Sequence, residues 1–175
     1  IGQEGFLIKA IQLKDKKVLV LTAKEDIGIL YGVFRLLRLM QSHKTLNSIN
    51  LVDTPKIALR LLNHWDNLDR TVERGYAGFS LWNWQKLPEY IDHRYIDYAR
   101  ANASIGINAV SLTNVNANAL ILTPMYLEKV EALANVFRPY GIKVYLTARF
   151  SAPIEIGGLN TADPLNAEVQ EWWEN

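Results

Sequence analysis

Residues 105–110, Ile-Gly-Ile-Asn-Ala-Val, and residues 140–147, Tyr-Gly-Ile-Lys-Val-Tyr-Leu-Thr, decide the fold. In each stretch a glycine, Gly106 or Gly141, is followed at once by an apolar segment rich in β-branched residues. Such a glycine commonly ends a helix, and the apolar segment predicts a strand. The two glycines are separated by the length of one helix and one strand. A helix, a glycine stop and a strand repeated in this way are typical of βα units with parallel strands.

The pattern continues on both sides of this repeat. Spacing of apolar residues predicts a helix over 92–103 and a second helix that carries Leu127, Val130, Ala134 and Phe137. The second helix is opened by Thr123-Pro124 as cap and first turn and is expected to stop at Tyr140-Gly141. The nearly continuous apolar run Ile57–Leu62 predicts an earlier strand covered on both faces. A last helix is expected to begin near Asp163-Pro164.

The fold class is therefore α/β, and we expect a partial TIM (β/α)8 barrel, about the first three βα units. No Gly-x-Gly-x-x-Gly motif follows any of the predicted strands, which disfavours a dinucleotide-binding fold. A flavodoxin-like sheet stays open on periodicity alone.

The N-terminal part has a different pattern. Alternation predicts strands over Phe6–Leu13 and Val18–Thr22, and Asp26 is placed to cap the helix that follows. Gly28 and Gly32 lie on one face of that helix, which predicts close packing of the helix on a sheet. A phosphate-binding loop would instead carry its glycines before the helix.

A domain boundary is expected after the polar stretch 42–50, at Asp53-Thr54-Pro55, because proline discourages a continuing helix. We therefore divide the chain into residues 1–54, a β-β-α unit, and residues 55–175, the first part of the barrel.

Composition narrows the class of protein. The 175 residues are 49% hydrophobic, with 19 basic and 18 acidic side chains and a net charge of +1. This predicts a real core, no nucleic-acid surface and no membrane span. The absence of cysteine excludes disulfides, thiolate metal sites and a cysteine nucleophile. Because the chain starts at Ile1 and ends in what looks like an unfinished helix, we expect a piece of a longer protein, and localisation stays open.

Functional groups of a barrel belong at the carboxyl ends of its strands, here residues 63–67, 113–118 and 148–152. The first loop mixes aromatic, amide and carboxylate side chains, a combination suited to sugars, and the second is rich in asparagine. The candidate substrate-binding residues are Trp65, Asp66, Asn67, Val115, Asn116 and Arg149.

Several of these residues also have a purely structural interpretation. Trp65 could pack at the barrel top, and His64 has no nearby serine or cysteine to activate. Trp82 and Trp84 are more typical of a core or lid than of sugar platforms. The carboxylates and the scattered histidines lack the spacing of calcium or zinc sites, so we expect no metal and no cofactor.

The segment Asn63-His64-Trp65-Asp66-Asn67-Leu68-Asp69, followed by Glu73-Arg74-Gly75-Tyr76-Ala77-Gly78, closely resembles alpha-glucuronidases of glycoside hydrolase family 67. Residues 30–37, Leu-Tyr-Gly-Val-Phe-Arg-Leu-Leu, are similar to the end of that family's N-terminal α/β domain. The resemblance implies an inverting hydrolase that removes (4-O-methyl-)glucuronic acid side chains from xylo-oligosaccharides. A homodimer of the whole protein is compatible with it.

Residue roles follow from this resemblance only where positions match. Trp65 resembles the tryptophan that packs against the glucuronic acid, and Val115 the valine beside its 4-O-methyl group. The catalytic carboxylates of the family are expected beyond Asn175, so no catalytic residue is assigned within this chain. Arg70 stands where the family pattern leads us to expect glycine.

Two other functions are left open by the residues themselves. A non-catalytic carbohydrate-binding module could use Trp65, Trp82 and Trp84 as its binding surface. An unrelated α/β barrel enzyme, or a flavodoxin-like protein, would share the periodicity but not the family motif.

Overall fold

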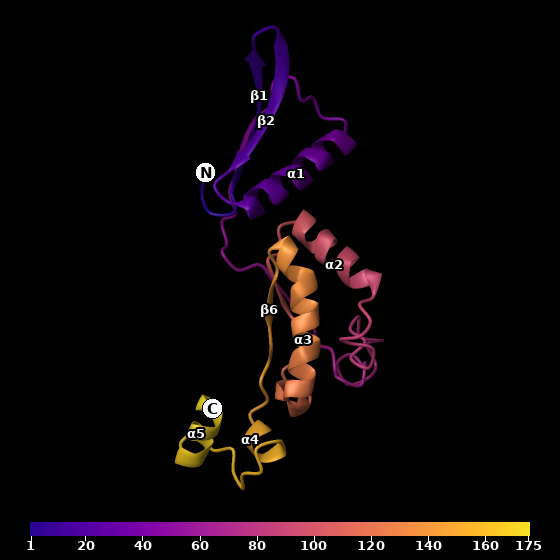
Figure 1. Ribbon diagram of the computed structural model, residues 1–175, viewed down its shortest axis with the longest axis vertical. Helices are drawn as coiled ribbons and strands as arrows, with labels where there is room; N and C mark the ends of the chain where they lie inside the picture. The colour runs from indigo at the N-terminus through magenta and orange to yellow at the C-terminus, as the bar shows by residue number, and fades with distance from the viewer. The chain divides into compact units, whose positions relative to one another are not determined.

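The computed structural model describes residues 1–175, and they divide into two compact units. Figure 1 traces the chain through both. Unit 1 consists of Ile1–Leu61, Ile96–Ala109 and Phe137–Lys143. Unit 2 consists of Leu62–Tyr95, Val110–Val136 and Val144–Asn175. The proposed division at residues 54 and 55 stays a prediction.

Unit 1 contains an antiparallel sheet of three strands in the order β2-β1-β3. Strand β1 (Phe6–Leu13) pairs with β2 (Lys16–Ala23) along its whole length, which confirms the two predicted strands. Strand β3 (Asn50–Asp53) pairs with the start of β1 and was not predicted. Its only apolar residues are Leu51 and Val52, too few to produce a visible alternation.

Helix α1 (Asp26–Gln41) packs on this sheet through its glycines, as predicted. A Cβ on Gly28 would lie 2.5 Å from the carbonyl oxygen of Gly5, and one on Gly32 would lie 3.1 Å from Leu21. The prediction that Asp26 caps the helix is wrong. The cap residue is Glu25, which makes no side-chain cap bond, and Asp26 lies in the first turn, where its charge suits the helix dipole.

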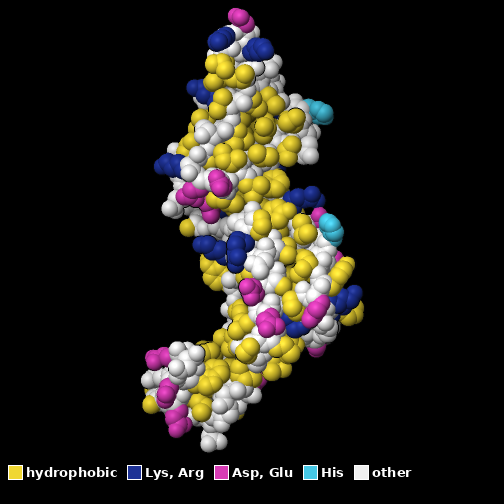
Figure 2. All heavy atoms as spheres, viewed as in Figure 1, with side chains coloured by type: hydrophobic (Ala, Val, Ile, Leu, Met, Phe, Trp, Pro, Cys, Tyr) yellow, Lys and Arg dark blue, Asp and Glu magenta, His cyan; other side chains and the backbone are white.

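The core of unit 1 joins side chains that are far apart in the sequence. Phe6, Ile8, Tyr31 and Ala103 form a buried cluster, surrounded by partly buried residues from the sheet and α1. Other large apolar side chains of unit 1 stay exposed, among them Leu37 and Met40 of α1. Figure 2 shows hydrophobic side chains gathered at the surface over β1, β2 and α1.

A second sheet has the order β4-β5-β6, formed by Leu61–Asn63, Ala109–Ser111 and Lys143–Tyr145. Its strands are parallel, since the N–H of Asn108 donates to the Arg60 carbonyl before the N–H of His64 donates to the Ser111 carbonyl. Strands β5 and β6 show the same parallel pattern, in which the N–H of Lys143 donates to the Asn108 carbonyl and the N–H of Leu112 donates to the Tyr145 carbonyl.

The predicted strand over Ile57–Leu62 is wrong in extent and burial, because only β4 forms and its neighbours are exposed. Ile57 is 66% and Leu59 is 50% exposed. The carbonyls of Ile57 and Ala58 accept hydrogen bonds from the Arg60 guanidinium instead of pairing with a strand.

The helices between these strands match the predictions closely. Helix α2 spans His93–Ser104 and α3 spans Pro124–Phe137, flanked by the 3₁₀ turns η1 (Ala119–Leu122) and η2 (Arg138–Tyr140). The stop glycines Gly106 and Gly141 have φ of +82° and +68°, so both adopt the left-handed conformation that ends a helix.

The C-terminal part has two short helices, α4 (Ala152–Glu155) and α5 (Ala167–Glu174). Helix α5 begins later than predicted, because the Asn166 side chain caps it by accepting hydrogen bonds from the N–H groups of Glu168 and Val169. None of the helices has the length and apolar character needed to cross a membrane. The architecture is mixed α/β, and its two sheets do not close into a barrel.

Candidate functional site

A pocket of about 420 Å³ opens beside the loops that follow β4 and β5. All of its lining residues come from unit 2: Trp65, Asn67, Glu73, Arg74, Asn114 and Asn116. The pocket therefore lies at the carboxyl ends of two neighbouring parallel strands, where the sequence predicts functional groups.

Two asparagines hold the first two loops together. The Asn114 side chain is buried, and its amide donates to the Asn67 side-chain oxygen at 2.5 Å and to the Trp65 carbonyl at 3.3 Å. Its own oxygen accepts from the N–H of Asn116 at 2.6 Å. The Asn67 amide in turn donates to the Thr71 hydroxyl and to the Glu73 carbonyl. These bonds fix the positions of Trp65 and Asn116 at the pocket.

The loop after β6 joins the same network through Thr147. Its hydroxyl lies 3.0 Å from the Thr113 hydroxyl and donates to the Asn114 carbonyl at 2.8 Å. The ends of all three parallel strands are thus connected by side chains of asparagine and threonine, which can satisfy buried backbone groups that no strand pairs.

The loop over residues 66–79 folds back on itself in an unusual backbone conformation. Bridges join Asp66 to Val72 and Thr71 to Phe79. Arg70 and Glu73 have φ of +73° and +59°, values that non-glycine residues adopt at a cost of roughly 1–2 kcal/mol each. Such strain persists only where other interactions stabilise the loop, and the Asn67 amide bonds supply them.

Asp69 stabilises the turn that contains Arg70. Its carboxylate accepts hydrogen bonds from the hydroxyl and the N–H of Thr71, at 2.6 and 2.9 Å. These bonds hold the pKa of the Asp69 carboxyl below its usual value. The contribution to stability is therefore present at neutral pH and is lost as the pH falls through the lowered pKa.

The left-handed conformation of Arg70 explains why glycine is expected there. We predict that the free energy of unfolding of the Arg70→Gly variant is about 1 kcal/mol higher than that of Arg70→Ala, because only alanine keeps a Cβ in the strained conformation. Denaturant unfolding of the two variants checks this. The control is the pair Arg100→Gly and Arg100→Ala, inside α2. There the glycine variant should be the less stable of the two, since glycine costs about 1 kcal/mol in a helix. An alanine variant at position 70 as stable as the glycine variant contradicts the prediction.

Behind the pocket, Asp66 is buried and has its own partners. Its carboxylate accepts from the Ser80 hydroxyl at 2.5 Å and lies 3.4 Å from Nδ1 of His64. The His64 ring lies 5.0 Å from the ring of Trp82. His64 is therefore built into the support of the loop, in agreement with its structural interpretation.

Trp82 and Trp84 are core residues, with exposed fractions of 0% and 1%. The indole N–H of Trp82 donates to the Leu112 carbonyl at 3.0 Å. A binding surface that presents these two rings to a sugar is therefore ruled out, and the interpretation as core is confirmed. Trp65, in contrast, is 50% exposed at the pocket.

The structure brings only some of the predicted site residues together. Trp65, Asn67 and Asn116 line the pocket, whereas Asp66 lies behind it. Val115 is 62% exposed and Arg149 pairs with Glu155 at 3.2 Å, and neither lines the pocket. Their roles in binding stay predictions.

Sequence reasoning left three lining residues out of the predicted set, namely Glu73, Arg74 and Asn114. Asn114 lies in the asparagine-rich loop, and the predicted residues Val115 and Asn116 beside it were the signal that could have identified it. Glu73 and Arg74 reach the pocket only because the loop reverses at Arg70 and Glu73, and periodicity does not report such a reversal.

Chemically, the pocket combines one indole ring, three amides, one carboxylate and one guanidinium. An aromatic face covers the C–H groups of a sugar, while amides and charged groups pair with its hydroxyls. Glu73 is the single carboxylate in the lining. Inverting hydrolysis requires an acid and an opposing base, so the lining holds too few carboxylates for that reaction.

Comparison with known families gives a match over nearly the whole chain. The Glycosyl hydrolase family 67 middle domain matches residues 39–175, and the Glycosyl hydrolase family 67 N-terminus matches residues 1–36.

Curated relatives agree with these matches. A protein of Aspergillus terreus named "Probable alpha-glucuronidase A" is 41% identical over 85% of this chain and 18% of its own length. Its namesake in Aspergillus clavatus is 37% identical over 99% of this chain and 20% of its own length. "Alpha-glucuronidase A" of Emericella nidulans is 40% identical over 89% of this chain. The chain thus spans about a fifth of the length of these relatives.

Among solved structures, a GH138 enzyme targeting pectin rhamnogalacturonan II matches with a TM-score of 0.58 and 20% identity. The match covers 97% of this chain and 27% of that chain. This likeness concerns the fold alone.

Proposed function

Because this chain belongs to glycosyl hydrolase family 67, we propose that it is part of an alpha-glucuronidase that removes (4-O-methyl-)glucuronic acid side chains from xylo-oligosaccharides. The observation that carries the proposal is the pocket at the ends of β4 and β5, lined by Trp65 and three asparagines. Its mixture of one aromatic face and several amides suits a sugar acid, and the named relatives support the activity.

We further propose that β4, β5 and β6 are the first strands of a (β/α)8 barrel. The parallel order, the intervening helices α2 and α3, and the polar loops at one end of the sheet all support this arrangement. A barrel closes only with all its strands, so the chain by itself leaves open sheet edges. The catalytic acid and base would then lie on later strands, and this chain would supply one side of the sugar pocket.

An assay of the full-length protein tests this function. We expect it to release 4-O-methyl-glucuronic acid from an aldouronic acid, and residues 1–175 alone to release none. Trp65→Ala should lower kcat/KM roughly 10- to 100-fold, because an aromatic face in a binding site contributes on the order of 1–3 kcal/mol. The control Trp173→Ala removes another half-exposed tryptophan, from α5. No release by the full-length protein rejects the function, and unchanged kinetics of Trp65→Ala make Trp65 a packing residue.

Val115 gives a test of substrate specificity. The exposed side chain follows Asn114 in the loop after β5, and we propose that it borders the space for the 4-O-methyl group. Val115→Phe should crowd that space and lower kcat/KM for methylated substrates roughly tenfold more than for unmethylated ones. Kinetics with the two aldouronic acids measure the difference. An equal loss on both substrates counts against this role.

A further inference from the structure

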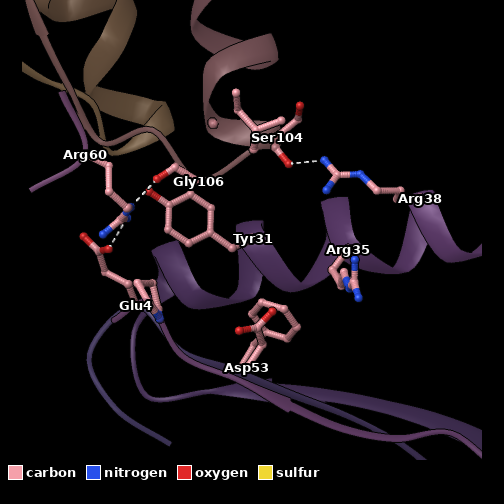
Figure 3. Close-up of a pocket in the computed structure, with 12 residues that line it drawn as sticks. Glu4, Tyr31, Arg35, Arg38, Asp53, Arg60, Ser104 and Gly106 are labelled. Atoms are coloured by element: carbon pink, nitrogen blue, oxygen red, sulfur yellow. Dashed lines mark hydrogen bonds and ion pairs between the residues drawn. The ribbon is translucent and has the colours of Figure 1, made fainter. Parts of the chain in front are cut away.

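A second cavity, of about 240 Å³, lies within unit 1 and shares no lining residue with the pocket of unit 2 (Figure 3). Its wall is formed by α1, by the sheet and by the last turn of α2 with the residues that follow it. It contains three arginines and two carboxylates: Arg35, Arg38, Arg60, Glu4 and Asp53. Nothing in the proposed hydrolysis uses these residues.

Two of the arginines already have protein partners. Arg60 donates to the Gly106 carbonyl and pairs with Glu4, each at 2.5 Å. Arg38 donates to the Ser104 carbonyl at 2.7 Å, at the C-terminus of α2, where a cation suits the helix dipole. Figure 3 shows both arginines directed to these partners. Arg38 and Arg60 therefore form part of the wall, but most of their N–H donors are directed to protein groups and few remain for a ligand.

The remaining charges of the cavity are unpaired. Neither Arg35 nor Asp53 belongs to an ion pair of this chain. The Nε–H of Arg35 is also buried without an acceptor, which is costly for a charged group. Asp53, in contrast, is exposed and hydrated. The buried N–H of Arg35 and the nearby exposed carboxylate of Asp53 together suit a ligand that provides both an acceptor and a donor.

Tyr31 adds a third polar group, whose ring centroid lies 5.9 Å from Cζ of Arg60 and whose hydroxyl interacts with the charge of that guanidinium. Its side chain is 7% exposed, and its hydroxyl is buried without a hydrogen-bond partner. Burial, and secondarily the charge of Glu4, raise the pKa of the Tyr31 hydroxyl, which therefore stays protonated and available as a donor. Figure 3 shows the ring extending from α1 toward Arg60 and Gly106.

The charge balance and the wall select the ligand. The three arginines exceed the two carboxylates by one positive charge, so a bound monoanion makes the cavity neutral. A dianion such as phosphate would leave one excess negative charge, which Asp53 and Glu4 repel. Phe6 and Tyr31 provide apolar surface for C–H groups. We propose that this cavity binds a small hydroxy acid of sugar-acid size, with its carboxylate on Arg35 and a hydroxyl donating to Asp53.

Calorimetric titration of the full-length protein with sodium D-gluconate tests this site. Sorbitol, which has the hydroxyls but no carboxylate, and inorganic phosphate are titrated in parallel. We expect gluconate to bind at least tenfold more tightly than either of them. Affinity for gluconate no higher than for sorbitol, or a higher affinity for phosphate, overturns the proposal without any variant.

Variants then locate the site. Arg35→Gln should weaken gluconate binding at least tenfold, and Asp53→Asn should weaken it less. The control Arg94→Gln, at an exposed arginine paired with Asp92, should bind gluconate normally. Trp65→Ala should also retain gluconate binding, since Trp65 belongs to the other pocket. Equal binding by Arg35→Gln and the unchanged protein rejects the site. Arg35→Gln should release 4-O-methyl-glucuronic acid at the normal rate, so this result is independent of the proposed hydrolysis.

Discussion

Replacing Asn67 by alanine is expected to lower kcat/KM of the full-length protein for the proposed substrate roughly 100-fold, the largest effect that we predict at the pocket beside β4 and β5. The Asn67 side chain donates to the Thr71 hydroxyl at 2.9 Å and to the Glu73 carbonyl at 2.8 Å, and accepts from Asn114. Three lost hydrogen bonds at about 1 kcal/mol each destabilise the ordered loop by about 3 kcal/mol. Because only the ordered loop presents Trp65 to the proposed substrate, the competent fraction falls by a factor of up to roughly 100.

The loss should come from disorder of the loop as much as from lost contacts. Without the Asn67 amide, the left-handed conformations of Arg70 and Glu73 lose two of the hydrogen bonds that stabilise the loop, and the buried Asn114 amide loses an acceptor. Hydrogen exchange should therefore quicken at the N–H of Glu73, which bonds to the Trp65 carbonyl.

A matched control is Asn118→Ala. Asn118 is an exposed asparagine of the loop after β5, where it caps η1 and lies outside the pocket lining. Its removal should cost about 1 kcal/mol of stability and leave kcat/KM nearly unchanged. If Asn67→Ala keeps normal kinetics and normal exchange at Glu73, the loop is ordered by other contacts and our account of it fails.

Arg60→Met is expected to lower the free energy of unfolding by about 3 kcal/mol, the largest effect on stability. Arg60 donates to the carbonyls of Ile57, Ala58 and Gly106 and to Glu4. Methionine keeps the apolar stem but leaves the Glu4 carboxylate without its cation. Breaking a buried pair costs about 3–5 kcal/mol, and the partial exposure of this pair, 17% and 24%, places the loss at the lower end.

Arg94→Met serves as the comparison for Arg60. Arg94 pairs with Asp92 at 3.4 Å, but its side chain is 59% exposed, so its removal should cost less than about 0.5 kcal/mol. Denaturant unfolding of the two variants, with hydrogen exchange at Asn108 as a local probe, measures the difference. Equal losses would mean that the four bonds of Arg60 add nothing beyond an ordinary surface pair.

The regular elements were predictable from sequence because each of them repeats a local signal. Apolar spacing located α2 to within a residue and Thr123-Pro124 located the start of α3. Gly106 and Gly141 marked the stops, although α3 itself ends at Phe137 and the 3₁₀ turn η2 fills the residues before Gly141. Strand β3 gave no such signal, since it contains two apolar residues between Asn50 and Asp53 and depends on pairing with β1. The apolar run Ile57–Leu62 has a strong local signal, yet most of it forms no strand. The guanidinium of Arg60 donates hydrogen bonds to two of the carbonyls that a strand would use.

The position of the candidate site was predictable from the sequence, but the set of residues that line it was not. Polar residues directly after a predicted strand located the pocket, and Trp65 and Asn67 were identified there. Asp66, by composition an equally good candidate, is buried against Ser80. Whether a loop side chain faces the pocket or the interior is decided by backbone angles such as that of Arg70, and no periodic pattern encodes them.

The asparagine and threonine bonds between the three strand ends also restrict how the protein can be re-engineered. Asn67, Asn114 and Thr147 belong to different loops, yet each completes the hydrogen bonding of another. A single loop exchanged for that of a relative would therefore arrive without its counterparts and leave buried polar groups unsatisfied. We therefore expect that the three loops must be transplanted together if the pocket is to keep its hydrogen bonds.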